Sequence, residues 1–285
     1  MPHPVPPRHT LSGPPGAPLL VLGPSLGTST RVWSAQLPAL ERAFRVARFD
    51  LPGHGGSATS APPLAEPFVP PFTEPFVPPL AEPFAEPGRA TVGDLAAAVL
   101  ALVDELGHER FHYAGISLGG AIGARLAADR PGRVASLALV CSSARFGPPG
   151  PWRERAALVR SRGMEAVTAA APGRWFAGPG TAGTALGRAL LRDLADADPA
   201  GYAACCDALA SYDLRPRLGR ITAPTLVVGG SLDTATPPEH ARELGAGIPR
   251  ATVETIGAGH LALEEPRAVT ELLLAHLGRS IAPSP

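Results

Sequence analysis

Short apolar runs recur along the chain, and amphipathic segments of helical length separate them. Continuous apolar runs predict strands buried on both faces of a sheet, because a half-exposed strand would alternate apolar with polar residues. The predicted strands are 18–23, 44–49, 111–116, 133–142, 224–229 and 251–256, and the predicted helices are 33–43, 94–106, 119–128, 238–246 and 266–277. Strands that alternate with helices in this way favour an α/β fold, a mostly parallel doubly wound sheet with helices on both faces.

The strand pattern is absent from about Arg145 to Asp213. This stretch is rich in Ala and Arg and has helical spacing at 153–162, 187–194 and 202–209. It is long enough to form a small helical cap inserted between two strands of the sheet. We therefore predict a core made of residues 1–142 and 214–285, with residues 143–213 as the cap.

Residues 62–85 state an eight-residue unit three times, as PPLAEPFV, PPFTEPFV and PPLAEPFA. Proline at this density is incompatible with helix interiors and with sheet ladders, and it favours extended polyproline conformation. Each unit is too short to stack on its neighbour as a solenoid repeat does. We interpret the segment as a low-complexity loop insertion in the core; a recognition ligand and a flap over the active site are the alternatives.

A serine lies between glycines in Gly115-Ile116-Ser117-Leu118-Gly119, after a predicted strand and before a predicted helix. Gly-x-Ser-x-Gly in that context predicts a nucleophile elbow, a tight turn that holds the serine hydroxyl above the sheet at a helix N-terminus. An ordinary loop is the alternative for the motif alone. The elbow interpretation requires an acid and then a histidine further along the chain.

Both groups follow in that order. Asp233 comes just after the strand 224–229, and His260 comes just after the strand that ends at Ile256. The carboxyl ends of parallel strands share one edge of the sheet, so Ser117, Asp233 and His260 are predicted to meet there as a catalytic triad. Asp213 competes as the acid, but it precedes a strand. The alternative interpretations are that Asp233 merely caps a helix and that His260 is merely a histidine fixed in a loop.

Acyl transfer also needs two backbone N–H groups aimed at the developing oxyanion. Leu118, the residue after the serine, is expected to supply one, and Leu26 in the loop after the first strand the other. Pro24 has no N–H to donate. Another histidine, His54, lies in a dense turn after the second strand, and we interpret it as fixing that turn through its own hydrogen bonds rather than as a catalytic group.

Composition excludes several other classes of protein. The formal net charge is zero, with 25 basic and 25 acidic residues, so nothing indicates a nucleic-acid partner or a basic membrane surface. No apolar stretch is long enough to cross a bilayer, and the N-terminus lacks the apolar core of a signal peptide. Three cysteines cannot build a disulfide framework. A cytoplasmic protein is the expectation. All basic residues are Arg, so only Arg can hold an anionic substrate by a fixed charge.

Several less generic stretches carry a family resemblance that runs from about Gly13 to Leu277, except for the inserted repeat at 62–85. They are Ser25-Leu26-Gly27-Thr28 with Trp33, Ser143-Ala144-Arg145-Phe146-Gly147 with Trp152, Arg174-Trp175-Phe176, Gly201-Tyr202-Ala203-Ala204-Cys205-Cys206, Pro224-Thr225-Leu226-Val227-Val228, and Asp233-Thr234-Ala235-Thr236-Pro237-Pro238. In these the chain resembles the 3-oxoadipate enol-lactonases, which have the α/β-hydrolase fold and act in the breakdown of protocatechuate and catechol. Pro24 stands where the family commonly has an asparagine.

The resemblance implies an anionic small-molecule substrate, an enol-lactone with an acetate arm, opened to 3-oxoadipate by Ser117 with His260 as base. It implies no cofactor and no metal. Arg145 and Arg174 would be candidates to bind the substrate carboxylate, Trp152 and Trp175 would form apolar walls, and Ser25 would contact the substrate beside Leu26. The alternatives are another hydrolase of this fold (a carboxylesterase, a carbon–carbon bond hydrolase or a cofactor-free perhydrolase) and a non-catalytic ligand-binding protein.

Overall fold

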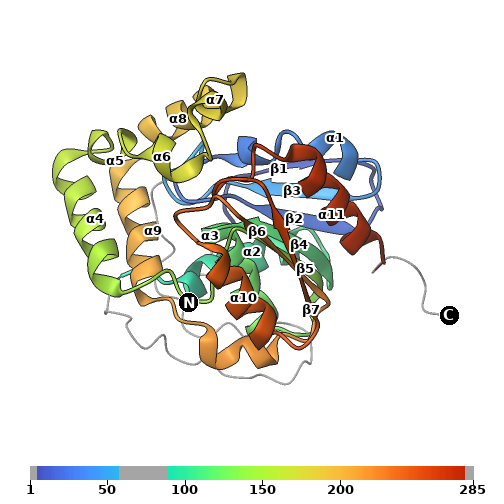
Figure 1. The fold of residues 1–285 in the computed structure, drawn as a ribbon. Coiled ribbons are helices and arrows are strands. Elements are labelled where there is room, and N and C mark those ends of the chain that lie inside the picture. The colour runs from blue at the N-terminus through green and yellow to red at the C-terminus, as the bar shows by residue number, and fades with distance from the viewer. Residues whose placement is uncertain (1–4, 58–88, 280–285) are drawn as a thin grey trace.

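A seven-stranded sheet forms the centre of the computed structural model, which describes residues 5–57 and 89–279 (Figure 1). The strands are β1 (His9–Ser12), β2 (Leu19–Gly23), β3 (Arg45–Phe49), β4 (Phe111–Ile116), β5 (Val134–Val140), β6 (Thr225–Gly230) and β7 (Ala251–Ile256). They lie in the order β1-β3-β2-β4-β5-β6-β7, with β1 antiparallel to β3 and every other neighbouring pair parallel. The predicted α/β fold with a mostly parallel sheet is confirmed.

Helices cover both faces of this sheet, which explains why the central strands read as continuous apolar runs. Every residue of β2, β4 and β6 is buried. The covering helices are α1 (Leu37–Leu40), α2 (Val92–Glu105), α3 (Leu118–Asp129), α10 (Pro238–Gly247) and α11 (Pro266–Arg279). α1 packs with α11 on one side, and α2 packs with α3 on the other (Figure 1). The core therefore lies between the sheet and these two helical layers.

The parallel order brings four loops to one edge of the sheet. The chain leaves β2 at Gly23, β4 at Ile116, β6 at Gly230 and β7 at Ile256, and all four strands run in the same direction. In an open parallel sheet this carboxyl edge is where ligands bind. The fold thus gathers the Pro24–Thr28 loop, Ser117, Asp233 and His260 from distant parts of the sequence.

One predicted helix is wrong in form. The stretch 33–43 is not a single helix: a 3₁₀ turn, η1, covers Thr30–Trp33, and the short α1 starts afresh at Leu37. Pro38 explains the break, because a proline inside a helix lacks the N–H for the ladder and its ring clashes with the carbonyl four residues earlier. Pro38 is accommodated in the first turn of α1, where neither problem arises. The edge strand β1 had no sequence prediction.

Six helices lie between β5 and β6, in the span predicted to form the cap. They are α4 (Pro149–Arg162), α5 (Glu165–Thr168), α6 (Ala171–Trp175), α7 (Pro179–Ala182), α8 (Ala185–Ala195) and α9 (Pro199–Ser211), and in Figure 1 they stand to one side of the sheet. α4 packs along α9, and a 3₁₀ turn, η2 (Arg215–Arg220), leads back to the sheet. The proline-rich repeat at 62–85 lies outside the described residues. Within the described part of the chain, no helix is both long and apolar enough to cross a membrane.

Candidate active site

Ser117 lies on a tight backbone turn that is possible only because the neighbouring residues are glycines. Its φ is 55°, in the left-handed region that non-glycine residues rarely adopt. The strained turn is held from both ends, since its N–H donates to Val140 O at 3.0 Å and its carbonyl accepts from Ser142 Oγ at 2.8 Å. A Cβ on Gly119 would collide with the backbone of Gly23 in β2. The glycines of the motif are thus required because strand and helix approach too closely for any side chain.

The structure brings the other two predicted triad members to this serine. His260 Nε2 lies 2.8 Å from Ser117 Oγ, and His260 Nδ1 lies 2.9 Å from Asp233 Oδ2. All three side chains are buried. This is the geometry in which an imidazole can take a proton from a hydroxyl while a carboxylate holds its tautomer and stabilises its charge.

Asp233 is also held by groups other than the histidine. Its Oδ1 accepts from the backbone N–H groups of Ala235 (2.8 Å) and Thr236 (2.9 Å), and its Oδ2 accepts from Thr236 Oγ1 (2.6 Å). Burial raises the pKa of this carboxyl, but the bonds and charge of His260 and the two bonds from Thr236 outweigh it, so the pKa of Asp233 is lowered. Asp233 is therefore an ionised acceptor as well as a turn cap. Sequence reasoning had missed Thr236, which no local motif distinguishes.

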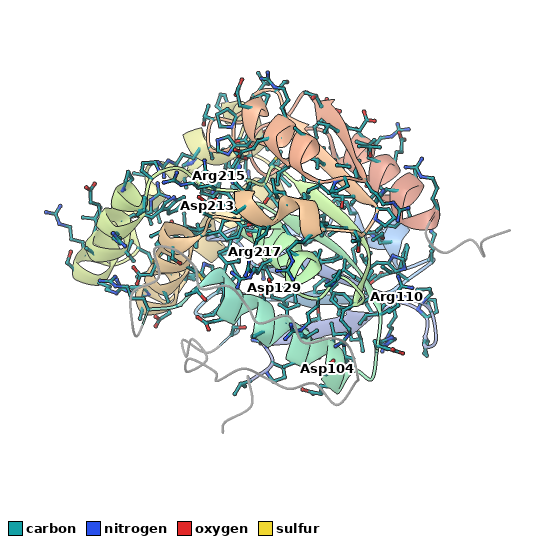
Figure 2. The ribbon with its side chains drawn as sticks, turned by 90° about the horizontal axis from the view of Figure 1, so that it is seen from below. Asp104, Arg110, Asp129, Asp213, Arg215 and Arg217 are labelled. Atoms are coloured by element: carbon teal, nitrogen blue, oxygen red, sulfur yellow. The ribbon has the colours of Figure 1, made fainter. Side chains whose placement is uncertain are left out.

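The competing acid, Asp213, does not reach the histidine. Its carboxylate pairs with Arg215 Nη2 at 2.6 Å, and Figure 2 shows the two side by side. The hydrogen bond from Arg215 lowers the pKa of Asp213, with a smaller contribution from the charge of Arg145. Asp213 thus belongs to a separate arginine cluster.

The backbone N–H groups of Leu26 and Leu118 have no acceptor among the described residues. Leu118 is the first residue of α3, where an N–H has no partner within the helix. Leu26 lies in the Ser25–Thr28 turn, closed by Thr28 N–H to Ser25 O at 3.0 Å. Pro24 does not leave this loop loose, because its carbonyl accepts from Gly119 N–H at 3.0 Å. The two N–H groups predicted to act as oxyanion donors are therefore unpaired within the described part of the chain.

Ser117 and His260 open into a cavity of about 280 Å³ that is also lined by residues from among helices α4–α9, which are called the cap helices below. Four of the predicted substrate contacts line it: Ser25, Trp152, Arg174 and Trp175. Arg145 does not line it, and this expectation is corrected. The hydrogen bond from Leu214 N–H to Ala144 O directs the chain so that the charge of Arg145 lies near Asp213 instead.

Arg155 lines the cavity and had no place in the sequence prediction. It lies on α4, half-buried, with its guanidinium carbon 4.6 Å from the centre of the Trp152 ring. The guanidinium also faces Tyr202. Burial raises the pKa of Tyr202, and the positive charge of Arg155 acts against this rise. The lining residues that the structure describes include Arg155 and Arg174 but neither Asp nor Glu. A spacing of Trp and Arg at i and i+3 was the available signal, and it is too common to stand out.

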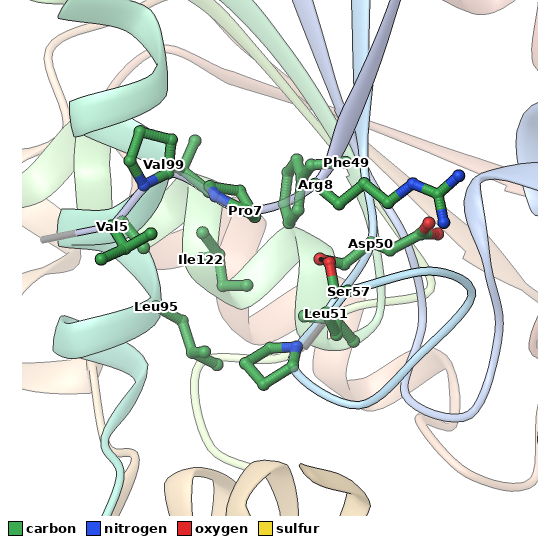
Figure 3. A pocket seen from close by; sticks show the side chains of 13 residues that line it. Val5, Pro7, Arg8, Phe49, Asp50, Leu51, Ser57, Leu95, Val99 and Ile122 are labelled. Atoms are coloured by element: carbon green, nitrogen blue, oxygen red, sulfur yellow. Dashed lines mark hydrogen bonds between the residues drawn. The ribbon is translucent and has the colours of Figure 1, made fainter. Parts of the chain in front are cut away.

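A second cavity of about 240 Å³ lies between the N-terminal segment and α2 (Figure 3). Its lining is mainly apolar, with Arg8 and Asp50 at one end and Ile122 and Leu95 across from them. It contains neither Ser117 nor His260, so the chemistry belongs to the cavity beneath the cap. No cluster of three or more metal-ligating side chains occurs within residues 5–57 and 89–279.

The sheet order, the elbow and the converging Ser, Asp and His are the features of α/β-hydrolases. A model of the alpha/beta hydrolase fold family matches residues 18–177 and 190–266, and the chain belongs to this family. It is a hydrolase of that fold.

Among individual relatives, the chain is 31% identical to 3-oxoadipate enol-lactonase 2 of Acinetobacter baylyi over 265 residues, which covers 92% of this chain and 89% of the relative. The enol-lactonase from Burkholderia xenovorans superposes with a TM-score of 0.82 at 32% identity, over 95% of this chain and 96% of that one. A thermophilic esterase from Thermogutta terrifontis superposes with a TM-score of 0.79 at 25% identity, over 96% and 94% of the two chains.

Proposed function

We propose that this hydrolase opens a small anionic lactone, 3-oxoadipate enol-lactone, to 3-oxoadipate, with Ser117, His260 and Asp233 as its catalytic groups. One observation carries the proposal: among the described residues that line the cavity around Ser117 and His260, two are arginines, Arg155 and Arg174, and none is Asp or Glu. An anionic ester would be drawn to such a cavity, whereas a cationic one would be repelled. The enol-lactonase relatives support the same substrate class.

In the first half of the reaction, Ser117 passes its proton to His260 Nε2 as Oγ attacks the lactone carbonyl carbon. The oxygen of the tetrahedral intermediate receives the N–H groups of Leu26 and Leu118. When the intermediate collapses, the ring C–O bond breaks, the enol oxygen leaves, and the proton on His260 neutralises it. The enol then becomes the ketone, which makes this step difficult to reverse.

In the second half, water replaces the leaving group. His260 takes one proton from the water as its oxygen attacks the acyl carbon, and the intermediate collapses to release Ser117 Oγ, which recovers that proton. The new carboxylate is the second carboxylate of 3-oxoadipate. Asp233 stays ionised throughout and stabilises the imidazolium formed in each half.

Arg155 is the side chain that we assign to the substrate carboxylate. The Trp152 ring and Tyr202 restrict it, so little side-chain freedom is lost when it binds an anion. A guanidinium can bind a carboxylate through two parallel hydrogen bonds, and a charged hydrogen bond contributes about 1.5–3 kcal/mol. Arg174 is exposed at the cavity and would assist entry of the anion.

The test is to follow the loss of enol-lactone ultraviolet absorbance, with p-nitrophenyl acetate as a neutral ester. The wild type should turn over the lactone, and Ser117→Ala should abolish this while remaining folded. Arg155→Met should raise KM for the lactone about 10- to 100-fold and leave the neutral ester unaffected. Arg162→Met is the matched control, since Arg162 is an exposed arginine of the same helix outside the cavity.

Other outcomes would replace the proposal. Turnover of p-nitrophenyl acetate without turnover of the lactone would indicate a carboxylesterase of different specificity. No turnover of either ester would favour a ligand-binding protein. Full lactone turnover by Ser117→Ala would refute the assignment of the nucleophile.

A further inference from the structure

His54 is a buried histidine outside the triad, and its protonation state follows from its neighbours. Its side chain is 1% exposed in the turn after β3. Nε2 lies 3.0 Å from the backbone N–H of Gly27 and accepts from it, while Nδ1 lies 2.8 Å from the carbonyl of Pro52. A carbonyl can only accept, so Nδ1 carries the proton and Nε2 carries none. Burial lowers the pKa of His54 to about 4, which keeps the ring neutral at neutral pH.

The N–H group that donates to His54 belongs to the central peptide of the Ser25–Thr28 turn, which also contains the expected oxyanion donor and is called the oxyanion loop below. Gly27 has φ of 83°, the conformation of the third residue in a type II turn, and the turn runs from Ser25 to Thr28. Type I and type II turns differ by a flip of the central peptide, here the one that joins Leu26 to Gly27. The hydrogen bond to His54 holds that peptide in one orientation. Rotation of this peptide would change the backbone angles of Leu26, whose own N–H is the expected oxyanion donor.

The turn that carries His54 is itself bonded to the start of α9 and to the segment just after the Ser25–Thr28 loop. The imidazole stacks on the Tyr202 ring of α9, with centres 5.9 Å apart and planes at 26°. Gly53 O accepts from Asp198 N–H at 2.8 Å at the start of the same helix. Asp50 Oδ1 accepts from Thr30 N–H at 2.9 Å, just beyond the loop. The position of the His54 acceptor is therefore set by contacts with both α9 and the loops at the edge of the sheet.

We propose that His54 is a positioning residue that orients the Leu26 N–H toward the tetrahedral intermediate by fixing the Leu26–Gly27 peptide. This inference rests on the proposed ester hydrolysis, because it concerns the oxyanion formed in that reaction. His54 does not touch the reacting atoms. Its contribution should appear in the transition state and not in substrate binding, because the oxyanion exists only after attack.

The test compares His54→Phe, which keeps an aromatic ring against Tyr202 but has no acceptor, with His54→Gln, whose amide oxygen can accept from Gly27. The matched control is His112→Phe. His112 is another buried histidine. It lies on β4, its Nδ1 is 2.7 Å from Ser136 Oγ on β5, and it does not line the catalytic cavity. For each variant we would measure kcat and KM on the lactone, thermal unfolding, and inhibition by a boronic acid, whose serine adduct is tetrahedral and anionic.

His54→Phe should lower kcat about 10- to 100-fold with KM changed less than about threefold, since complete loss of one oxyanion donor typically costs 10²–10³. Boronate affinity should fall by a similar factor, His54→Gln should recover most of both, and His112→Phe should change neither. If His54→Phe does not fold, His54→Asn replaces it, because the shorter amide cannot reach Gly27.

A folded His54→Phe enzyme with unchanged kcat, or one whose kcat falls with unchanged boronate affinity, would overturn the inference. Equal activity of the Gln and Asn variants would do the same. A wild type that hydrolyses neither the lactone nor p-nitrophenyl acetate would instead contradict the proposed function, so the two failures are distinguishable.

Discussion

The substitution Asp233→Asn tests the triad most sharply, because the surrounding bonds dictate how the new amide must sit. The Oδ1 position faces two backbone donors, the N–H groups of Ala235 and Thr236. An NH₂ group there would meet both donors, so the amide oxygen must occupy this position and the NH₂ must take the place of Oδ2. The NH₂ then faces His260 Nδ1, which has to become an acceptor.

This change moves the histidine proton to Nε2, the nitrogen 2.8 Å from Ser117 Oγ. A protonated Nε2 cannot receive the serine proton, so kcat should fall about 10⁴-fold, which corresponds to about 5.5 kcal/mol. Folding should be nearly unaffected. Thr236 Oγ1, which donates to Asp233 Oδ2 in the wild type, has Cys141 O as a second acceptor at 3.0 Å and can also accept from the new NH₂.

The assay is the initial rate on the lactone and on p-nitrophenyl acetate, together with thermal unfolding of each variant. Asp213→Asn is the matched control, since it alters the competing acid in its ion pair with Arg215 and should change kcat by less than about twofold. A Asp233→Asn enzyme that keeps kcat within about tenfold of the wild type would refute the tautomer reasoning. Loss of activity in Asp213→Asn alone would identify the other carboxylate as the acid.

Three further predictions concern the framework. Gly119→Ala should destabilise the fold by about 1–3 kcal/mol in chemical denaturation, because its Cβ would lie 2.7 Å from Pro24 O and nearer still to Gly23. The control is Gly150→Ala, whose Cβ would have no atom within 4 Å and which should be neutral or slightly stabilising. Glu264→Ala should lower both kcat, several-fold, and the melting temperature, because this carboxylate accepts from Gly259 N–H (3.1 Å), beside His260, and from Ala177 N–H (2.9 Å) in the cap. The control is Glu265→Ala, which changes an exposed glutamate. Equal effects of the two substitutions would contradict the reasoning. Acid titration of the unfolding free energy should show stability falling from pH 6.5 toward pH 4, because burial lowers the pKa of both His54 and His112 from 6.5 to about 4 and only the unfolded chain takes up their protons in that window. Each histidine accounts for about 3 kcal/mol of this loss, so His112→Phe should flatten the pH dependence, and an unchanged slope would show that this histidine is not buried neutral.

The sequence by itself determined the six parallel strands of the sheet, the elbow, and the order in which Ser117, Asp233 and His260 occur along the chain. Continuous apolar runs can be satisfied only by strands covered on both faces, and a serine between glycines at a strand-to-helix junction has one favourable backbone arrangement. Asp233 and His260 could be placed because each directly follows a strand, and parallel strands end at a common edge. These are local patterns combined with one topological rule.

Only the tertiary structure decided which cap residues face the cavity. Arg155 enters it and Arg145 does not, because the packing of α4 on α9 and the backbone bond between Leu214 and Ala144 orient the cap, and neither contact leaves a periodic signal in the sequence. The same holds for His54, whose acceptor meets Gly27 from 27 residues away, and for Thr236 beneath the acid. A hydrogen bond between segments that lie far apart depends on where folding places both partners, and no property of either segment alone contains that information.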